Sequence, residues 1–128
     1  MSTRIGKRFT FEAAHRLGGL PEGHKCSRLH GHSYTVEVII AATALSGPGF
    51  VADFADLDPL KRYLAGVFDH RVLNDVIGVE PTSENLARVV FDWCTANVPL
   101  PGGASFEAVQ VSETPATWAE YRPAGELT

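Results

Sequence analysis

The sequence predicts a single α+β domain in which an antiparallel sheet carries two helices on one face. Three observations predict it: alternating apolar residues toward both ends of the chain, helical spacing of apolar residues between them, and the resulting order strand, strand, helix, helix, strand, strand. The chain has 128 residues, of which 45% are hydrophobic. A chain of this size can bury a core without a disulfide or a metal, so we expect one domain over residues 1–128.

Residues 5–15 and 30–42 are predicted to form the first two strands. In the first segment Phe9 and Phe11 lie on one face, and His15 has the same parity. In the second segment apolar residues also recur at every second position, which is the period of a half-buried strand. A glycine-rich loop joins the two segments, so we expect them to pair antiparallel.

Two helices are predicted next. Residues 53–68 carry leucines at helical spacing, and the second helix begins at Thr82, whose side chain can cap it. The apolar stripe of the second helix includes Cys94, and the proline and glycine residues at 99–103 end it.

Residues 106–112 and 118–121 return to strand patterning, so the predicted sheet has four antiparallel strands. Four strands leave two exposed edges, and two helices cover only one face. Natural sheets hide such edges. We therefore expect an oligomer in which sheets join side by side.

Composition excludes several classes of protein. Eleven Lys and Arg residues against fifteen Asp and Glu give a net charge of −4, which argues against a general nucleic-acid binder. No apolar run reaches the ~18 residues that span a bilayer, and no signal peptide is evident, so we expect no membrane association. Cys26 and Cys94 are too few for a secreted disulfide framework and fit a cytoplasmic protein.

Three of the five histidines are predicted to converge on one ion. His30 and His32 are two positions apart at the start of a strand, so both imidazoles project to one side. His15 ends the preceding strand, and antiparallel pairing brings it beside them. Three imidazoles with an open position compose a catalytic zinc site, whereas structural sites normally have four protein ligands and more thiolates. The alternative is a chance His-x-His pair, and His24 is interpreted as a solvated loop residue.

Cys26 lies on the loop that enters the strand of His30. Its thiol could be a fourth ligand, a nucleophile or a base, and the sequence leaves these roles open. Lys25, Arg28 and a metal ion could each favour the thiolate, because a free cysteine has a pKa of about 8.5. Cys94 is interpreted as a core residue.

Two further groups each have two interpretations. Asp69 precedes His70 after the first helix, and an aspartate beside a histidine can make it a general acid or base. A helix C-terminal cap is the alternative interpretation of His70. Glu113 ends the third predicted strand, and by itself it is interpreted as a surface charge.

Six short motifs stand in order along nearly the whole chain. They are FEAAH at 11–15, CSRLHGH at 26–32, VADF at 51–54, FDH at 68–70, PTSENLA at 81–87 and VSET at 111–114. Together they resemble the 6-pyruvoyl-tetrahydropterin synthase superfamily. The Cys-x-x-x-His-Gly-His spacing is similar to its 6-carboxy-tetrahydropterin synthase branch, which serves queuosine and other 7-deazaguanine pathways, whereas the pyruvoyl enzymes typically separate the Cys further. Phe68 departs from the leucine that often precedes Asp-His, with no expected effect on the chemistry.

The resemblance implies a tunnelling fold (T-fold), in which trimers close a barrel and stack in pairs as hexamers with sites at subunit interfaces. It also implies roles for individual residues. The implied zinc ligands are His15, His30 and His32. The implied catalytic acid–base set is Cys26, Asp69 and His70. Glu113 would hold the pterin, since its carboxylate matches two N–H donors on the ring edge.

The implied reaction converts 7,8-dihydroneopterin triphosphate to 6-carboxy-5,6,7,8-tetrahydropterin, acetaldehyde and triphosphate, with Zn²⁺ and no redox cofactor. We further expect Lys25 and Arg28 to help bind the triphosphate. One alternative is a 6-pyruvoyl-tetrahydropterin synthase, which stops at triphosphate elimination; another is a non-catalytic metal- or pterin-binding module. The Cys26-to-His30 spacing favours the carboxy product, and the presence of both Cys26 and His70 favours an enzyme.

Overall fold

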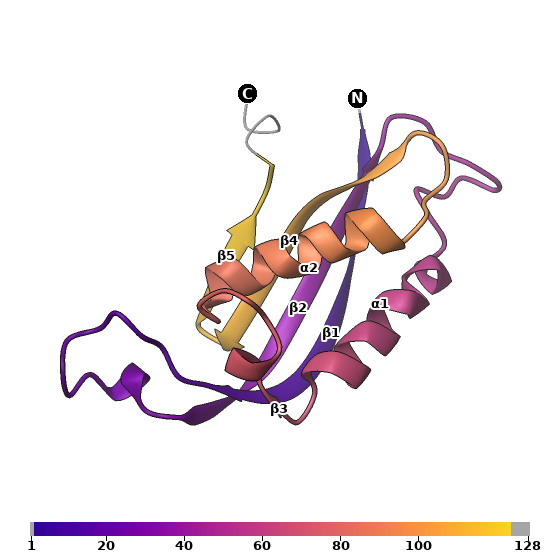
Figure 1. Cartoon of the computed structure of the whole chain (residues 1–128). Coiled ribbons are helices and arrows are strands. Elements are labelled where there is room, and N and C mark those ends of the chain that lie inside the picture. Colours follow the sequence, from indigo (N-terminus) through magenta and orange to yellow (C-terminus); the bar gives the residue numbers. More distant parts are fainter. Residues whose placement is uncertain (1, 124–128) are drawn as a thin grey trace.

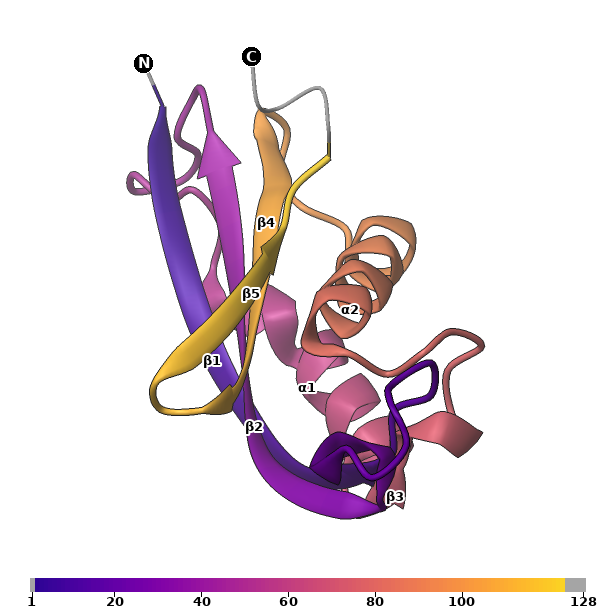
Figure 2. The ribbon, with the colours of Figure 1, turned by 90° about the vertical axis from the view of Figure 1, so that its left-hand side faces the viewer.

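The computed structural model describes residues 2–123, which form a twisted sheet with the two longer helical segments against one face (Figures 1 and 2). The strands are β1 (Thr3–His15), β2 (His30–Ala42), β3 (Arg71–Val72), β4 (Ala104–Thr114) and β5 (Thr117–Tyr121). Their order across the sheet is β3-β1-β2-β4-β5. The predicted α+β class and the four longer strands are therefore confirmed.

Both predicted helices are present, and each begins at a side-chain cap. The first is a continuous run of three helical types: η2 (Phe54–Leu57), α1 (Asp58–Tyr63) and the π-helical η3 (Leu64–Phe68). Asp53 caps it by accepting from the N–H of Ala55 at 2.9 Å. The second helix is α2 (Ser83–Asn97), and the Thr82 hydroxyl accepts from the N–H of Asn85 at 3.1 Å. Two short turns complete the helical elements: η1 (Lys25–Ser27) and η4 (Leu73–Asp75).

The expectation of four antiparallel strands was wrong in one respect. β3 is a fifth strand, and it pairs parallel with Ala13 and Ala14 of β1. The N–H of His70 donates to the carbonyl oxygen of Glu12 at 2.6 Å, which aligns β3 beside β1. A two-residue strand has no readable periodicity, so only this long-range pairing reveals it.

The core lies between the sheet and the helices, and it fixes the register of β1 and β2. Phe11 stacks on Tyr34 with ring centroids 5.0 Å apart, and Phe68 packs against Phe11 from the helical side. This packing supports the pairing in which His15 lies opposite His30. Among residues 2–123, no helix combines the length and the apolar character needed to cross a bilayer.

Candidate active site

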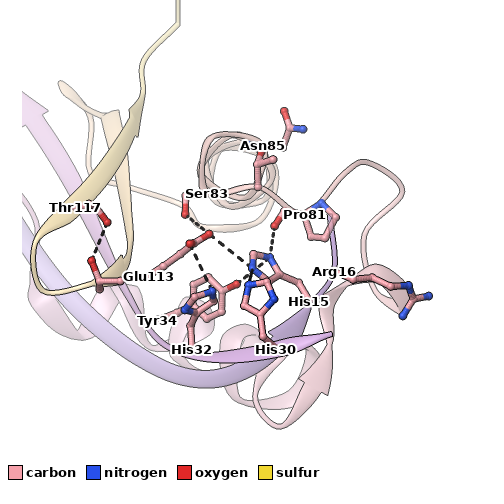
Figure 3. A network of polar contacts seen from close by, with 12 residues as sticks. His15, Arg16, His30, His32, Tyr34, Pro81, Ser83, Asn85, Glu113 and Thr117 are labelled. Atoms are coloured by element: carbon pink, nitrogen blue, oxygen red, sulfur yellow. Dashed lines mark hydrogen bonds and ion pairs between the residues drawn. The ribbon is translucent and has the colours of Figure 1, made fainter. Parts of the chain in front are cut away.

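The three histidines singled out by their parity meet at the paired ends of β1 and β2. His15 is paired with His30, and His32 is paired with Ala13, two positions before His15. One ring nitrogen from each of the three histidines lies within 4.8 Å of the other two (Figure 3). His15 is fully buried, while His30 and His32 are half-buried. This group could hold a metal ion.

Hydrogen bonds to backbone carbonyls orient two of these rings. Nδ1 of His15 lies 2.7 Å from the carbonyl oxygen of Pro81, and Nδ1 of His30 lies 2.7 Å from that of Arg28. A carbonyl oxygen only accepts, so each Nδ1 carries the proton, and each neutral ring then presents an Nε2 lone pair. These two Nε2 atoms are 3.1 Å apart. Two facing lone pairs repel unless a cation lies against them, so the donor set fits a divalent metal of the kind that imidazoles bind.

The third histidine adds a nitrogen that lacks a partner. Nε2 of His32 is buried and has no hydrogen-bond partner among the described residues. Burial lowers the pKa of His32, and the nearby His15 and His30 lower it further, whereas Glu113 acts in the opposite direction. The ring therefore favours its neutral form, which is the form that coordinates metals.

Tyr34 closes the inner side of the histidine group. Its hydroxyl lies 3.2 Å from Nδ1 of His15, and the ring is fully buried. Burial, with a smaller contribution from the charge of Glu113, raises the pKa of this phenol. Tyr34 therefore stays neutral, and its hydroxyl can hydrogen-bond to His15 at the buried side of the histidine group.

Glu113 reaches the histidines from β4, which pairs with β2 on the side away from β1. Its Oε2 lies 3.5 Å from Nε2 of His32, and its Oε1 lies 3.9 Å from Nε2 of His15. Ser83, the first residue of α2, donates to Oε1 at 2.8 Å. The side chain of Glu113 keeps 25% of its exposure and borders a hollow over the polar face of the sheet, so a ligand can reach it.

Asp69 and His70 form a dyad beside β1. Oδ2 of Asp69 lies 2.9 Å from Nδ1 of His70, and Oδ1 accepts from the N–H of Glu12 at 2.9 Å. The backbone hydrogen bond from Glu12, followed by the contact with His70, lowers the pKa of Asp69. His70 has a φ of 60°, which turns it away from the end of η3. Its side chain is 78% exposed and can meet a substrate or a second chain.

The structure does not bring Cys26 to this dyad. Cys26 lies in η1 on the loop between β1 and β2, which extends from the sheet in Figure 1, and it is half-exposed. No hydrogen bond or ion pair within residues 2–123 joins it to Asp69 or His70. Lys25 and Arg28 are exposed on the same loop, and the backbone carbonyl of Arg28 orients His30.

Two residues of the site were not predicted as such. Tyr34 was interpreted only as part of an apolar face, although its parity with His32 places it on the face of the three histidines. Ser83 was interpreted only as part of a helix start. Its contact with Glu113 spans two elements that are distant in sequence, so no local pattern could reveal it. His24, interpreted as a solvated loop residue, is exposed and accepts from the N–H of Cys26 at 3.0 Å.

Fold and site together define the class of this protein: an α+β protein with a three-histidine candidate metal centre at one end of its sheet and a carboxylate beside it. The family model of 6-pyruvoyl tetrahydropterin synthase matches residues 4–124. The chain belongs to this family.

Individual relatives agree with this membership. The chain is 43% identical over 127 residues to a 6-carboxy-5,6,7,8-tetrahydropterin synthase of Synechocystis sp., covering 91% of both chains. It is 33% identical over 130 residues to the Bacillus subtilis protein of the same name, covering 95% of this chain and 86% of the relative. The solved structure of Caenorhabditis elegans 6-pyruvoyl tetrahydropterin synthase superposes with a TM-score of 0.82 at 25% identity, covering 97% of both chains.

Proposed function

We propose that this protein is a zinc-dependent 6-carboxy-5,6,7,8-tetrahydropterin synthase. It would convert 7,8-dihydroneopterin triphosphate and water to 6-carboxy-5,6,7,8-tetrahydropterin, acetaldehyde and triphosphate, in the cytoplasm and in a 7-deazaguanine pathway such as that of queuosine. The observation that carries the proposal is the three-histidine group with Glu113 beside it. The two 6-carboxy-tetrahydropterin synthases at 43% and 33% identity support the choice of product.

The proposed metal ligands are His15, His30 and His32. The carbonyl oxygens that hold Nδ1 of His15 and His30 support this assignment, because they leave both Nε2 lone pairs facing the centre of the group. Zinc, when bound there, supplies a Lewis acid that acidifies the C–H bonds next to oxygens of the substrate side chain.

Glu113 is proposed to bind the pterin ring. A carboxylate can accept two N–H donors from the guanidine-like edge of a pterin in a bidentate, charge-assisted arrangement. Ser83 holds Oε1 of Glu113 at 2.8 Å, so the carboxylate is oriented before the substrate arrives. Because Glu113 is also close to His32, a pterin bound to it would lie beside the three histidines.

The proposed proton transfers use Cys26, Asp69 and His70. Asp69 orients His70 through Nδ1 and leaves Nε2 free to accept or donate a proton. Cys26, as the thiolate, would take a proton from the substrate side chain, with the exposed Lys25 and Arg28 binding the triphosphate. Triphosphate loss, followed by cleavage of a C–C bond in which one water molecule is consumed, then releases acetaldehyde and leaves the carboxyl group on the ring. No external reductant is needed, because the reduction of the ring is internal to the substrate.

The separation of Cys26 from the dyad supports an oligomeric site. Beyond its short pairing with β3 at Ala13 and Ala14, β1 has an open outer edge in the described chain, and β5 forms the other edge of the sheet. We propose that neighbouring chains join along these edges as a trimer or a hexamer, so that the dyad of one chain serves the Cys26 of another. Native mass spectrometry tests this arrangement, and a monomer at working concentration would contradict it.

The experiment that tests the reaction is an incubation of zinc-loaded protein with 7,8-dihydroneopterin triphosphate, followed by mass spectrometry of the products. We expect 6-carboxy-5,6,7,8-tetrahydropterin and acetaldehyde, both lost in the Cys26→Ala variant. The second candidate is a 6-pyruvoyl-tetrahydropterin synthase, favoured by the structural likeness to the C. elegans enzyme; a pyruvoyl product would establish it. Zinc bound without turnover would instead indicate a binding module.

A further inference from the structure

The loop that carries Cys26 is closed at its base by a backbone hydrogen bond. The N–H of Leu17 donates to the carbonyl oxygen of Cys26 at 2.9 Å. The position of Cys26 therefore depends directly on the position of Leu17, the second residue after β1. Whatever holds the backbone on either side of Leu17 also holds Cys26.

On the N-terminal side of Leu17, the side chain of Asn74 binds the backbone of Arg16 through both of its polar atoms. Oδ1 of Asn74 accepts from the N–H of Arg16 at 2.9 Å, and Nδ2 of Asn74 donates to the carbonyl oxygen of Arg16 at 2.9 Å. One carboxamide thus satisfies the donor and the acceptor of one residue. The pair continues the parallel β1–β3 pairing past its last backbone contact at Ala14.

On the C-terminal side of Leu17, the carboxylate of Glu80 accepts from the N–H of Gly18. The backbone carbonyl of Glu80 in turn accepts from the side chain of Asn85 at 3.0 Å, which ties this contact to α2. Three consecutive residues at the base of the loop are therefore held by Asn74, by Cys26 and by Glu80.

The segment that holds the loop is the one that follows the dyad. Asn74 lies in η4, directly after β3, and β3 directly follows His70. We propose that Asn74 is a positioning residue for the reaction: by holding Arg16, the residue after His15, its carboxamide sets the place of the Cys26 loop beside the three histidines of the same chain, where the dyad of a neighbouring chain would meet it. This inference rests on the proposed function.

The chemistry of the contact makes Asn74 hard to replace. An asparagine offers a donor and an acceptor in one plane, whereas an aspartate offers only acceptors. In Asn74→Asp, one oxygen would still accept from the N–H of Arg16, but the other would face the carbonyl oxygen of Arg16 and repel it. Asn74→Ala would remove both hydrogen bonds.

The test measures the reactivity of Cys26 and the steady-state kinetics of the zinc-loaded protein. For Asn74→Ala and Asn74→Asp, we expect kcat to fall about 100-fold, since a displacement of about 1 Å costs this much, while KM and zinc content stay near those of the wild type. The rate at which a disulfide reagent modifies Cys26, measured against pH without substrate, should shift in both variants. Wild-type kcat and a wild-type reactivity profile in both would overturn the proposal.

Two further sets of variants separate positioning from folding. Asn97→Ala is the matched control, because Asn97 donates to a single carbonyl, that of Trp93, at the exposed end of α2; it should behave as the wild type.

Glu80→Gln keeps an acceptor for Gly18 and should retain kcat, whereas Glu80→Ala should lower it. Equal kcat values for the two Glu80 variants would count against the proposal even where the Asn74 variants fail to fold. If the wild type makes no 6-carboxy product, the proposed function fails, and the thiol profile still tests whether Asn74 holds the Cys26 loop in place.

Discussion

Oε2 of Glu113 lies 3.5 Å from Nε2 of His32, and this nitrogen has no hydrogen-bond partner among the described residues. The contact joins β4 to the end of β2 where the three histidines meet. A carboxylate and an imidazole lone pair at this distance leave a place for a positively charged or N–H-bearing group. A metal ion and the N–H edge of a pterin both have that character, so this corner of the fold fits the metal and the substrate that we propose.

Removal of one histidine should strongly weaken metal binding. In His32→Ala, two imidazoles remain, and we expect zinc affinity to fall by about 100-fold or more, because loss of even an outer partner of a ligand costs 10–100-fold. Zinc per chain after dialysis against a weak chelator measures this effect. The control is His24→Ala, on the loop outside the cluster, which should retain its zinc. Full zinc occupancy in His32→Ala would contradict the assignment.

Neutralisation of Glu113 should weaken substrate binding and leave the metal in place. A hydrogen bond to a charged group contributes ~2 kcal/mol, so Glu113→Gln should lower kcat/KM by about 30-fold. Steady-state kinetics and zinc analysis on the same samples measure both quantities. Glu107→Gln, which alters a carboxylate paired with Arg4 and Arg122 away from the histidines, is the comparison. A loss of kcat/KM of equal size in both variants would show that the effect is not specific to the pterin site.

The charge of Asp69 should stabilise the fold at neutral pH and lose this effect in acid. The N–H of Glu12 and the contact with His70 lower the pKa of Asp69 in the folded chain. Its stabilising contribution is therefore present above the ordinary pKa of an aspartate and is lost as the pH falls through the lower, folded value. Asp69→Asn can still accept from Glu12 but carries no charge. The difference in free energy of unfolding between wild type and variant should shrink as the pH falls below about 4.

Urea unfolding at a series of pH values measures this difference. Asp92→Asn serves as the control, because the Asp92–Arg88 pair lies exposed on one face of α2 and exposed pairs contribute little. A difference for Asp69→Asn that stays constant between neutral and acidic pH would refute the prediction.

The two thiols should differ in reactivity. Burial raises the pKa of Cys94 to about 12, and its side chain is inaccessible, so at pH 8 only about one thiol in 10⁴ is ionised. Cys26 is half-exposed. A thiol reagent should therefore modify one cysteine per chain in the native protein and two after unfolding, and Cys26→Ser should remove the native reaction. Rapid native modification of Cys94 would contradict the packing of α2.

Local patterning was enough for the parts of this protein in which side-chain direction follows from the backbone. A period of two placed His15, His30 and His32 on one face of their strands, and the structure joins them where β1 and β2 pair. The N-terminal cap at Thr82 likewise depends on residues within one turn. Such features need no knowledge of distant segments, because strand pleat and helix period set where each side chain projects.

Contacts between distant segments were decided by the tertiary structure. β3 exists because residues 69–72 align with β1, Glu113 reaches the histidines because β4 pairs with β2, and Asn74 meets Arg16 across the same corner. The sequence by itself determined the elements, the histidine face and, through its ordered motifs, the resemblance to the synthase family. Only the packing of the core sets which ends of those elements lie together, since pairing register and helix placement depend on burial summed over the whole chain.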